Sequence, residues 1–185
     1  EGITLETCND CFAGKQHQIS FKRSSHSTKS NVLDVVYSYL CGPMKVKTLG
    51  GALYFLTFVD EHSWKVWAYA LKSKDQVLDM FQQFQARVER ETGRKLKCIH
   101  TDNSGEYLGP LNRYCAEQGI KHEKTVPKTP QENGIAERMN RAIVERIRCM
   151  LCHSKLPKSF WGEAMRTAVD LINLSPSAPL NEDVP

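Results

Sequence analysis

Three short segments rich in β-branched and aromatic residues open the patterned part of the chain. They span residues 32–40 (VLDVVYSYL), 52–60 (ALYFLTFVD) and 64–72 (WKVWAYALK), and this composition is typical of strands. Gly42-Pro43 ends the first segment, and only residues 61–63 separate the second from the third. So short a connection predicts an antiparallel hairpin.

Helical patterns and two more strands follow. Residues 74–93 carry an amphipathic pattern that ends at Gly93, with one apolar face made of Val77, Leu78, Phe81, Phe84 and Val88. Residues 95–102 and 121–127 are predicted strands, and 111–120 a short helix. A long helix is predicted from about 133 to 151, with a core stripe of Ala136, Met139, Ile143, Ile147, Met150 and Leu151. The last helix is predicted over 159–174, capped by Ser159.

This element order indicates an α/β domain. Three strands followed by helix, strand, helix, strand and helix are typical of a mixed sheet covered by helices. The 185 residues are enough for one such domain with a substantial core. Residues 1–30 are polar and have the composition of a linker, so the core is predicted over 31–175 and a tail over 176–185.

The composition is that of a soluble globular protein and gives no sign of a membrane or a secreted disulfide-rich protein. The chain is 41% hydrophobic and 25% charged, as soluble globular proteins are. It has no apolar run of about 18 residues, so no membrane association is expected, and no signal-like stretch at its start. Seven cysteines, an odd number, do not suggest a secreted disulfide scaffold, and a reducing intracellular setting is expected.

The charge is unevenly distributed. Residues 121–158 hold nine Lys or Arg and four Glu, a net +5 within a chain whose total is +4. A basic stripe in one helical region is expected of a protein that binds a polyanion. The same residues can also form an ordinary solvated helix face with i,i+4 pairs such as Glu137–Arg141.

Two acidic residues lie at positions where they could take part in catalysis. Asp102 ends a predicted strand and opens the turn-like sequence Asn103-Ser104-Gly105, a position where α/β proteins bind ligands. Glu137 lies in the first turn of the long helix among several arginines. Each has an ordinary alternative, since Asp is a common turn residue and an acid in a first turn interacts well with the helix dipole.

The two motifs together, TDNSGEY at 101–107 and PQENGIAERMNR at 130–141, resemble the integrase core of copia-type LTR retrotransposons. The resemblance covers nearly the whole chain and extends to CNDCFAGKQH, LDVVYSYLCGPM, LPKSFWGEA and LINLSPSAPLN. Members of that family are D-D-E recombinases with a ribonuclease-H-like fold, here expected as a five-stranded mixed sheet with helices on both faces.

The resemblance implies a metal-dependent phosphoryl-transfer site. In that chemistry two divalent metals, Mg²⁺ or Mn²⁺, activate the incoming oxygen and stabilise the leaving one, and converging carboxylates hold them. Asp102 and Glu137 would be two of the three ligands. The residues implied to support the site or contact DNA are Asn103, Lys128, Asn133, Arg138, Asn140 and Arg141.

The first catalytic aspartate of the family is missing. It lies two residues before a Cys-Gly-Pro turn, where this chain has Tyr39. Asp34 is five residues earlier, an odd offset, and about 17 Å away along an extended strand, so it is not expected to substitute. Asp60 is given little weight as a substitute. A tyrosine is neutral at pH 7 and a poor Mg²⁺ ligand, so the site is expected to be impaired.

The cysteines do not complete a predicted zinc site. Cys8-x-x-Cys11 is half of one, which the resemblance assigns to a His-His-Cys-Cys module whose histidines are absent from this sequence. No zinc is therefore expected there. Cys149-x-x-Cys152 lies late in the long helix, where structural thiols are the favoured interpretation.

Three functions remain open from the sequence. The first is end-processing of element DNA and its transfer into a target by an integrase core whose activity Tyr39 impairs. The second is a catalytically inactive nucleic-acid-binding module derived from an integrase, and the third is a fold that serves only to dimerise. The family implies DNA as partner, a homo-oligomer, and location in the nucleus and in cytoplasmic particles.

Overall fold

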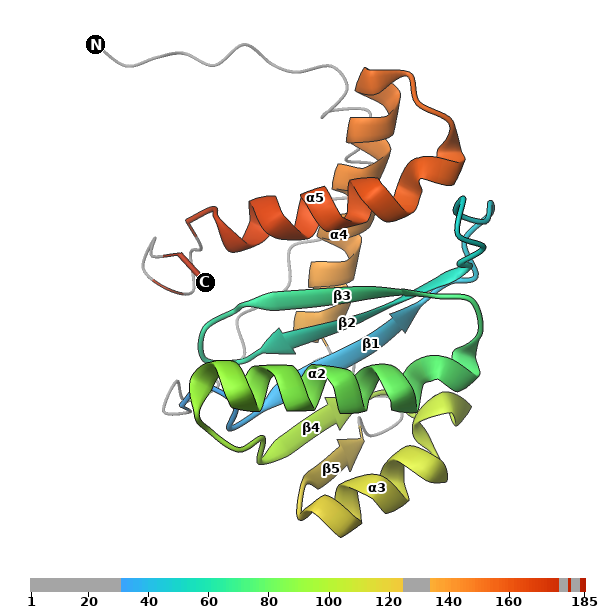
Figure 1. The fold of residues 1–185 in the computed structure, drawn as a ribbon. Helices are drawn as coiled ribbons and strands as arrows, with labels where there is room; N and C mark the ends of the chain where they lie inside the picture. Colours follow the sequence, from blue (N-terminus) through green and yellow to red (C-terminus); the bar gives the residue numbers. More distant parts are fainter. Residues whose placement is uncertain (1–30, 125–133, 177–179, 181–183) are drawn as a thin grey trace, which may run out of the picture.

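Five strands form one mixed sheet in the order β3-β2-β1-β4-β5 (Figure 1). The computed structural model describes residues 31–124, 134–176, 180, 184 and 185. The strands are β1 (Val36–Cys41), β2 (Tyr54–Asp60), β3 (Val66–Leu71), β4 (Cys98–Thr101) and β5 (Lys121–Lys124). β2 is antiparallel to both β1 and β3, whereas β4 is parallel to both β1 and β5. The predicted mixed sheet and its hairpin are confirmed.

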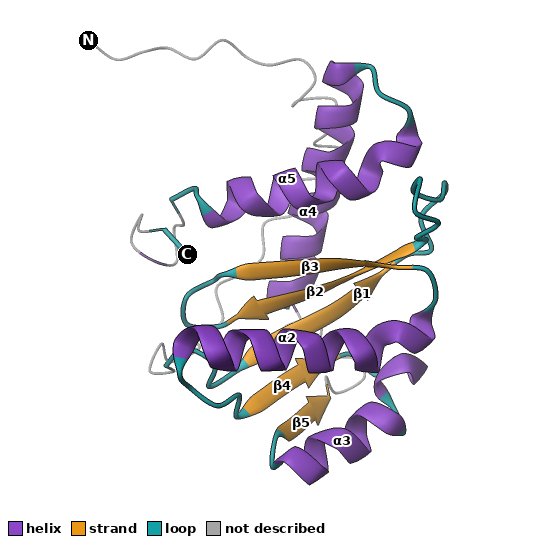
Figure 2. Cartoon of the chain, in the orientation of Figure 1, coloured by secondary structure: helices purple, strands orange, loops and turns teal. Residues whose placement is uncertain are grey.

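Helices cover both faces of the sheet (Figure 2). One apolar cluster joins the sheet to α2 (Val77–Thr92) and α3 (Pro110–Gln118), and a second joins it to α4 (Gly134–Ser154) and α5 (Trp161–Asn173). Three short 3₁₀ turns, η1 (Lys74–Gln76), η2 (Gly105–Tyr107) and η3 (Lys158–Phe160), complete the described elements. None of these helices is long and apolar enough to span a lipid bilayer.

The residues of β1 alternate between the two clusters. Val36 and Leu40 pack in the cluster that contains α2, whereas Tyr37, Tyr39 and Cys41 lie in the cluster that contains α4 and α5. This is the period of two that a strand imposes on its side chains. Tyr39 is thereby placed on the sheet face that α4 covers.

An aromatic group on the other face forms much of the first cluster. The Phe58 ring stacks on the Phe84 ring with centroids 4.1 Å apart and planes 10° from parallel. Tyr69 and Phe81 contact Phe58 at centroid distances of 6.0 Å each. Because Phe58 is on β2 and its partners are on α2 and β3, this group fixes α2 onto the antiparallel half of the sheet.

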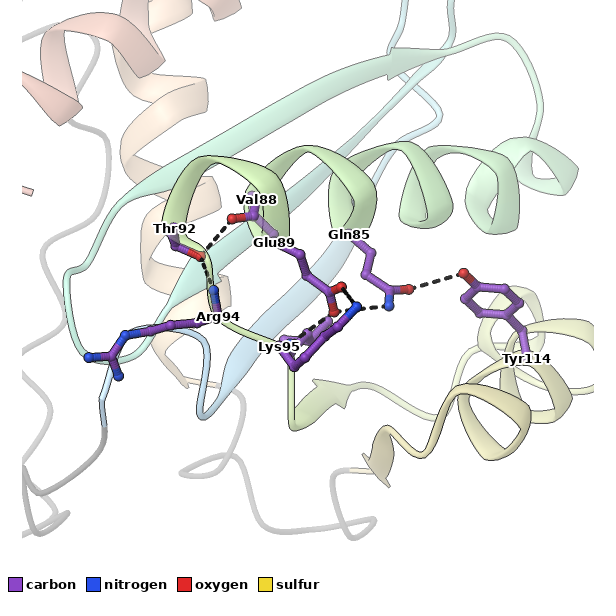
Figure 3. A network of polar contacts seen from close by, with 8 residues as sticks. Gln85, Val88, Glu89, Thr92, Arg94, Lys95 and Tyr114 are labelled. Carbon is purple, nitrogen blue, oxygen red and sulfur yellow. Dashed lines mark hydrogen bonds and ion pairs between the residues drawn. The ribbon is translucent and has the colours of Figure 1, made fainter.

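A polar network ties the end of α2 to β4 and α3 (Figure 3). The Glu89 carboxylate accepts hydrogen bonds from Gln85 Nε2 at 3.1 Å, Lys95 Nζ at 2.6 Å and the Leu96 amide at 3.1 Å. Gln85 in turn accepts a hydrogen bond from the Tyr114 hydroxyl of α3 at 3.1 Å. The segment that enters β4 is therefore held in place immediately before the strand that leads to Asp102.

Several predicted boundaries differ from the structure. β1 begins at Val36, four residues late, because the residues before it form a turn in which Leu33 has a φ of 66°. α4 continues to Ser154 instead of 151. The prediction that Ser159 caps the last helix is wrong: Ser159 lies inside η3, which begins after Pro157 and runs directly into α5.

Candidate functional site

The parallel pairing of β1 with β4 brings position 39 level with Asp102. Tyr37 pairs with His100, and Asp102 follows the last residue of β4 directly. Tyr39 and Asp102 each come two residues after this pair, toward the same end of the two parallel strands. The position that the family's first aspartate would occupy therefore lies next to the predicted second carboxylate.

Asp102 also forms the turn that its sequence predicts. Its Oδ1 accepts a hydrogen bond from the Ser104 amide at 3.0 Å, and its carbonyl oxygen accepts one from the Thr101 hydroxyl at 3.0 Å. The side chain is half-buried. The turn orients the carboxylate at the end of the strand, so the structural and the functional interpretations of Asp102 are compatible.

The first turn of α4 lies near β1, the strand that carries Tyr39. Glu137 is exposed in that turn, and Asn140, one turn later, is buried. Thr57 Oγ1 lies 3.1 Å from Asn140 Oδ1 and 3.2 Å from the Tyr39 carbonyl oxygen, so its single proton can be donated to either. Asn140 Nδ2 is buried and has no hydrogen-bond partner among the described residues.

The Thr57 contact was not predicted from the sequence. A threonine within a β-rich segment is an ordinary strand residue, and nothing in its neighbourhood marks a link to α4. Asn140, by contrast, is among the residues that the resemblance implies for the site, and its side chain is buried.

Electrostatics link Tyr39 to both predicted carboxylates. Burial raises the pKa of the Tyr39 phenol, and the charges of Glu137 and then Asp102 raise it further. Both carboxylates therefore lie within electrostatic reach of one phenol. Because an unperturbed tyrosine already titrates near pH 10, Tyr39 stays protonated and neutral at pH 7.

Asp34 and Asp60 are committed to other contacts. Asp34 lies before β1, and the hydrogen bond from Lys97 at 2.7 Å, with one from the Asn31 amide, lowers its pKa to about 2. Asp60 is fully buried at the opposite end of β2 from the site, where it accepts hydrogen bonds from the Leu33 amide and from Ser63. Neither can take the place of the missing aspartate.

The basic residues of α4 are exposed along the helix. Arg138, directly after Glu137, and Arg141, one turn beyond it, are exposed, and Arg148 is exposed farther along. Arg138 also lines a shallow pocket with Trp64 and Met139. The other predicted DNA contacts, Lys128 and Asn133, lie outside the described residues.

The described cysteines differ in their burial and in the elements that carry them. Cys8 and Cys11 lie outside the described residues. Cys149 is partly buried and Cys152 is exposed, both on α4. Cys98 and Cys115 are buried.

The donor set near position 39 has the chemistry of a site for a hard cation. Asp102 and Glu137 supply carboxylate oxygens, the ligands that Mg²⁺ and Mn²⁺ prefer. The protonated phenol adds no charge and is a poor ligand. The residues present therefore fit one divalent cation, and the ligand that a pair of cations would share is absent.

Comparison with known proteins gives one family and a consistent set of relatives. The integrase core domain family matches residues 40–130. A retrovirus-related Pol polyprotein from the transposon TNT 1-94 of Nicotiana tabacum is 58% identical over all of this chain, and one from the transposon RE2 of Arabidopsis thaliana is 35% identical over 98% of it. The chain spans 14% and 12% of the lengths of these two polyproteins.

A solved structure shares the fold. A chain in the cryo-EM structure of the simian T-cell lymphotropic virus intasome, in complex with PP2A regulatory subunit B56 gamma, superposes with a TM-score of 0.61. The match covers 85% of this chain and 54% of that chain, at 20% sequence identity. This likeness agrees with the predicted ribonuclease-H-like fold.

Proposed function

This chain carries an integrase core domain of the retrotransposon Pol polyprotein kind, and we propose that it binds DNA for integration while Tyr39 impairs its chemistry. One observation supports the second half of this proposal most directly: the phenol of Tyr39 is coupled electrostatically to both Glu137 and Asp102. A neutral side chain thus lies near the two acids, at the position where the family has its first catalytic aspartate.

Each nearby residue has a proposed part in the chemistry. Cleavage and strand transfer are in-line displacements at phosphorus, in which a bound divalent cation would stabilise the charge that develops on the oxygens. Asp102, at the end of β4, and Glu137, in the first turn of α4, would hold that cation. Arg138 and Arg141 would bind phosphate groups and orient the DNA. Tyr39 would leave the cation position with one ligand too few.

The other family properties remain proposals for this chain. They are contacts of Lys128 and Asn133 with DNA, assembly into a homo-oligomer, and location in the nucleus and in cytoplasmic particles. The inactive DNA-binding module differs from the impaired integrase only in whether restoring an aspartate restores activity. The purely structural alternative differs from both, because it requires no affinity for DNA.

Replacing Arg138 and Arg141 together by alanine should weaken binding to duplex DNA and flatten its salt dependence. Both side chains are exposed on the helix that carries Glu137. Each lost phosphate contact should reduce the slope of log K against log salt by about 0.9, so the double variant should lose about 1.8. Fluorescence anisotropy with a labelled duplex over a series of salt concentrations measures this slope.

A matched double variant makes this measurement specific. Arg90→Ala with Arg94→Ala removes the same charge from exposed positions in and directly after α2, on the opposite face of the sheet. That control should retain a slope close to that of the unaltered chain. Equal slopes for all three proteins would mean that the α4 arginines do not contact phosphate, and absence of salt-dependent binding in the unaltered chain would favour the structural alternative.

A further inference from the structure

A second group of ligand-type side chains lies on the parallel half of the sheet. Cys98 and His100 are two residues apart on β4, so they share one face, and Glu123 on β5 is paired in register with His100. The thiol sulfur, an imidazole nitrogen and a carboxylate oxygen of these residues all lie within 4.8 Å of one another. We call these three residues the β4–β5 cluster.

The cluster lies beyond the part of the sheet that α4 and α5 cover. His100 is on the face of its β1 neighbour Tyr37, whereas α2 and α3 pack on the other face (Figure 1). Cys98 is buried, and the side chains of His100 and Glu123 are 21% and 32% exposed. The group is therefore largely shielded by protein and still within reach of a small solute.

Neighbouring residues hold the cluster in place. The Tyr37 ring packs on the His100 ring at a centroid distance of 5.1 Å, and its hydroxyl donates a hydrogen bond to Glu61 Oε1 at 2.9 Å. His100 Nε2 contacts one Glu123 oxygen, and Lys121 pairs with the other. Contacts around metal ligands of this kind orient the ligands and tune the affinity of the site.

The geometry points to a binding site for a divalent transition metal of the Zn²⁺ class at Cys98, His100 and Glu123. Tetrahedral zinc, with bonds of about 2.0–2.3 Å, places its ligand atoms roughly 3.3–3.8 Å apart, which small rotations could reach from the present arrangement. Three protein ligands leave a fourth position for water or for the nearby Glu61. This inference does not depend on the proposed function.

The chemistry of the cluster differs from that of Asp102 and Glu137. A thiolate and an imidazole favour Zn²⁺, Co²⁺ and similar ions, whereas two carboxylates favour Mg²⁺ and Mn²⁺. Burial, followed by the charge of Glu123, raises the pKa of the Cys98 thiol to about 11. Binding would release that proton to solvent and replace the contact between His100 and Glu123 by two bonds to the metal.

A bound ion would also act on the neighbouring carboxylate site. His100 is two residues before Asp102 on the same chain segment, and Glu123 is on the last described strand before α4. Occupation of the cluster would fix the ends of β4 and β5 relative to each other. A bound ion would thus stabilise the pairing of β4 with β5, next to Asp102 at the end of β4.

Titration with Co²⁺ in excess Mg²⁺ tests this proposal. The 185-residue chain, with Cys8, Cys11, Cys149 and Cys152 replaced by serine to remove the thiols of the two Cys-x-x-Cys motifs, should develop a thiolate-to-cobalt charge-transfer absorption at one equivalent. Cys98→Ala should abolish the absorption, and Cys115→Ala, which removes another buried thiol, should leave it unchanged.

Glu123→Gln keeps the thiol and provides a second test if Cys98→Ala does not fold. Its Co²⁺ affinity should fall by at least the roughly 10- to 100-fold that loss of an outer-shell partner costs. An absorption that persists in Cys98→Ala, or a Co²⁺ affinity that Glu123→Gln leaves unchanged, would overturn the proposal. If the parent chain shows no such absorption, the proposal is also overturned, and the cluster is an ion pair between β4 and β5.

Discussion

Replacing Tyr39 by aspartate should give the chain metal-dependent strand-transfer activity at least roughly 100- to 1,000-fold above the unaltered protein. Metal stabilisation of phosphoryl transfer is worth several kcal/mol, and each 1.4 kcal/mol is a factor of ten in rate. The substitution adds a carboxylate next to Asp102 and Glu137, whose charges already reach position 39.

The measurement is single-turnover strand transfer with labelled element-end DNA in Mn²⁺. Tyr39→Asn is the matched control, because asparagine has the size of aspartate without its charge and should stay at background. Adding Glu137→Gln to Tyr39→Asp should remove the gained activity. If Tyr39→Asp and Tyr39→Asn behave alike, position 39 does not supply the missing ligand, and the inactive DNA-binding module becomes the better description.

Phe58→Ala should lower the free energy of unfolding by about 3–5 kcal/mol, the usual cost of truncating a buried phenylalanine. Phe58 is 1% exposed and is stacked on Phe84 at 4.1 Å, with Tyr69 and Phe81 also in ring contact. The cavity would open between β2 and α2, where a rigid sheet limits relaxation. Urea unfolding followed by circular dichroism measures the change.

Leu49→Ala is the control for this loss, because its side chain is 68% exposed and its removal should change stability by no more than about 0.5 kcal/mol. A cost below about 1 kcal/mol for Phe58→Ala would mean that the stacked rings do not hold α2 onto the sheet.

The strands and long helices could be predicted because their local patterns and their burial agree. The hairpin of β2 and β3 followed from two β-rich segments separated by three residues. Likewise Val77, Phe81, Phe84 and Val88 repeat at helical spacing, and all four are buried. Position 39 was identified through its spacing from Cys41, which the continuous strand β1 preserves.

Other features depend on contacts that no local pattern encodes. Ser159 has the residue type of a helix cap, but Pro157 starts a 3₁₀ turn that places it inside the turn. The β4–β5 cluster arises because β4 and β5 are parallel neighbours in a particular register, although Cys98 and Glu123 are 25 positions apart in the sequence. The Thr57–Asn140 contact likewise depends on how α4 crosses the sheet.

The central claim, that Tyr39 leaves an integrase core with DNA affinity and without chemistry, is tested most directly by comparing the unaltered chain with Glu137→Gln. Both proteins should bind the same DNA, and strand transfer in Mn²⁺ should be at the same background level in each, with Tyr39→Asp as the active reference. Strand transfer by the unaltered chain well above background, abolished by Glu137→Gln, would contradict the claim and show that the site works with a tyrosine at position 39.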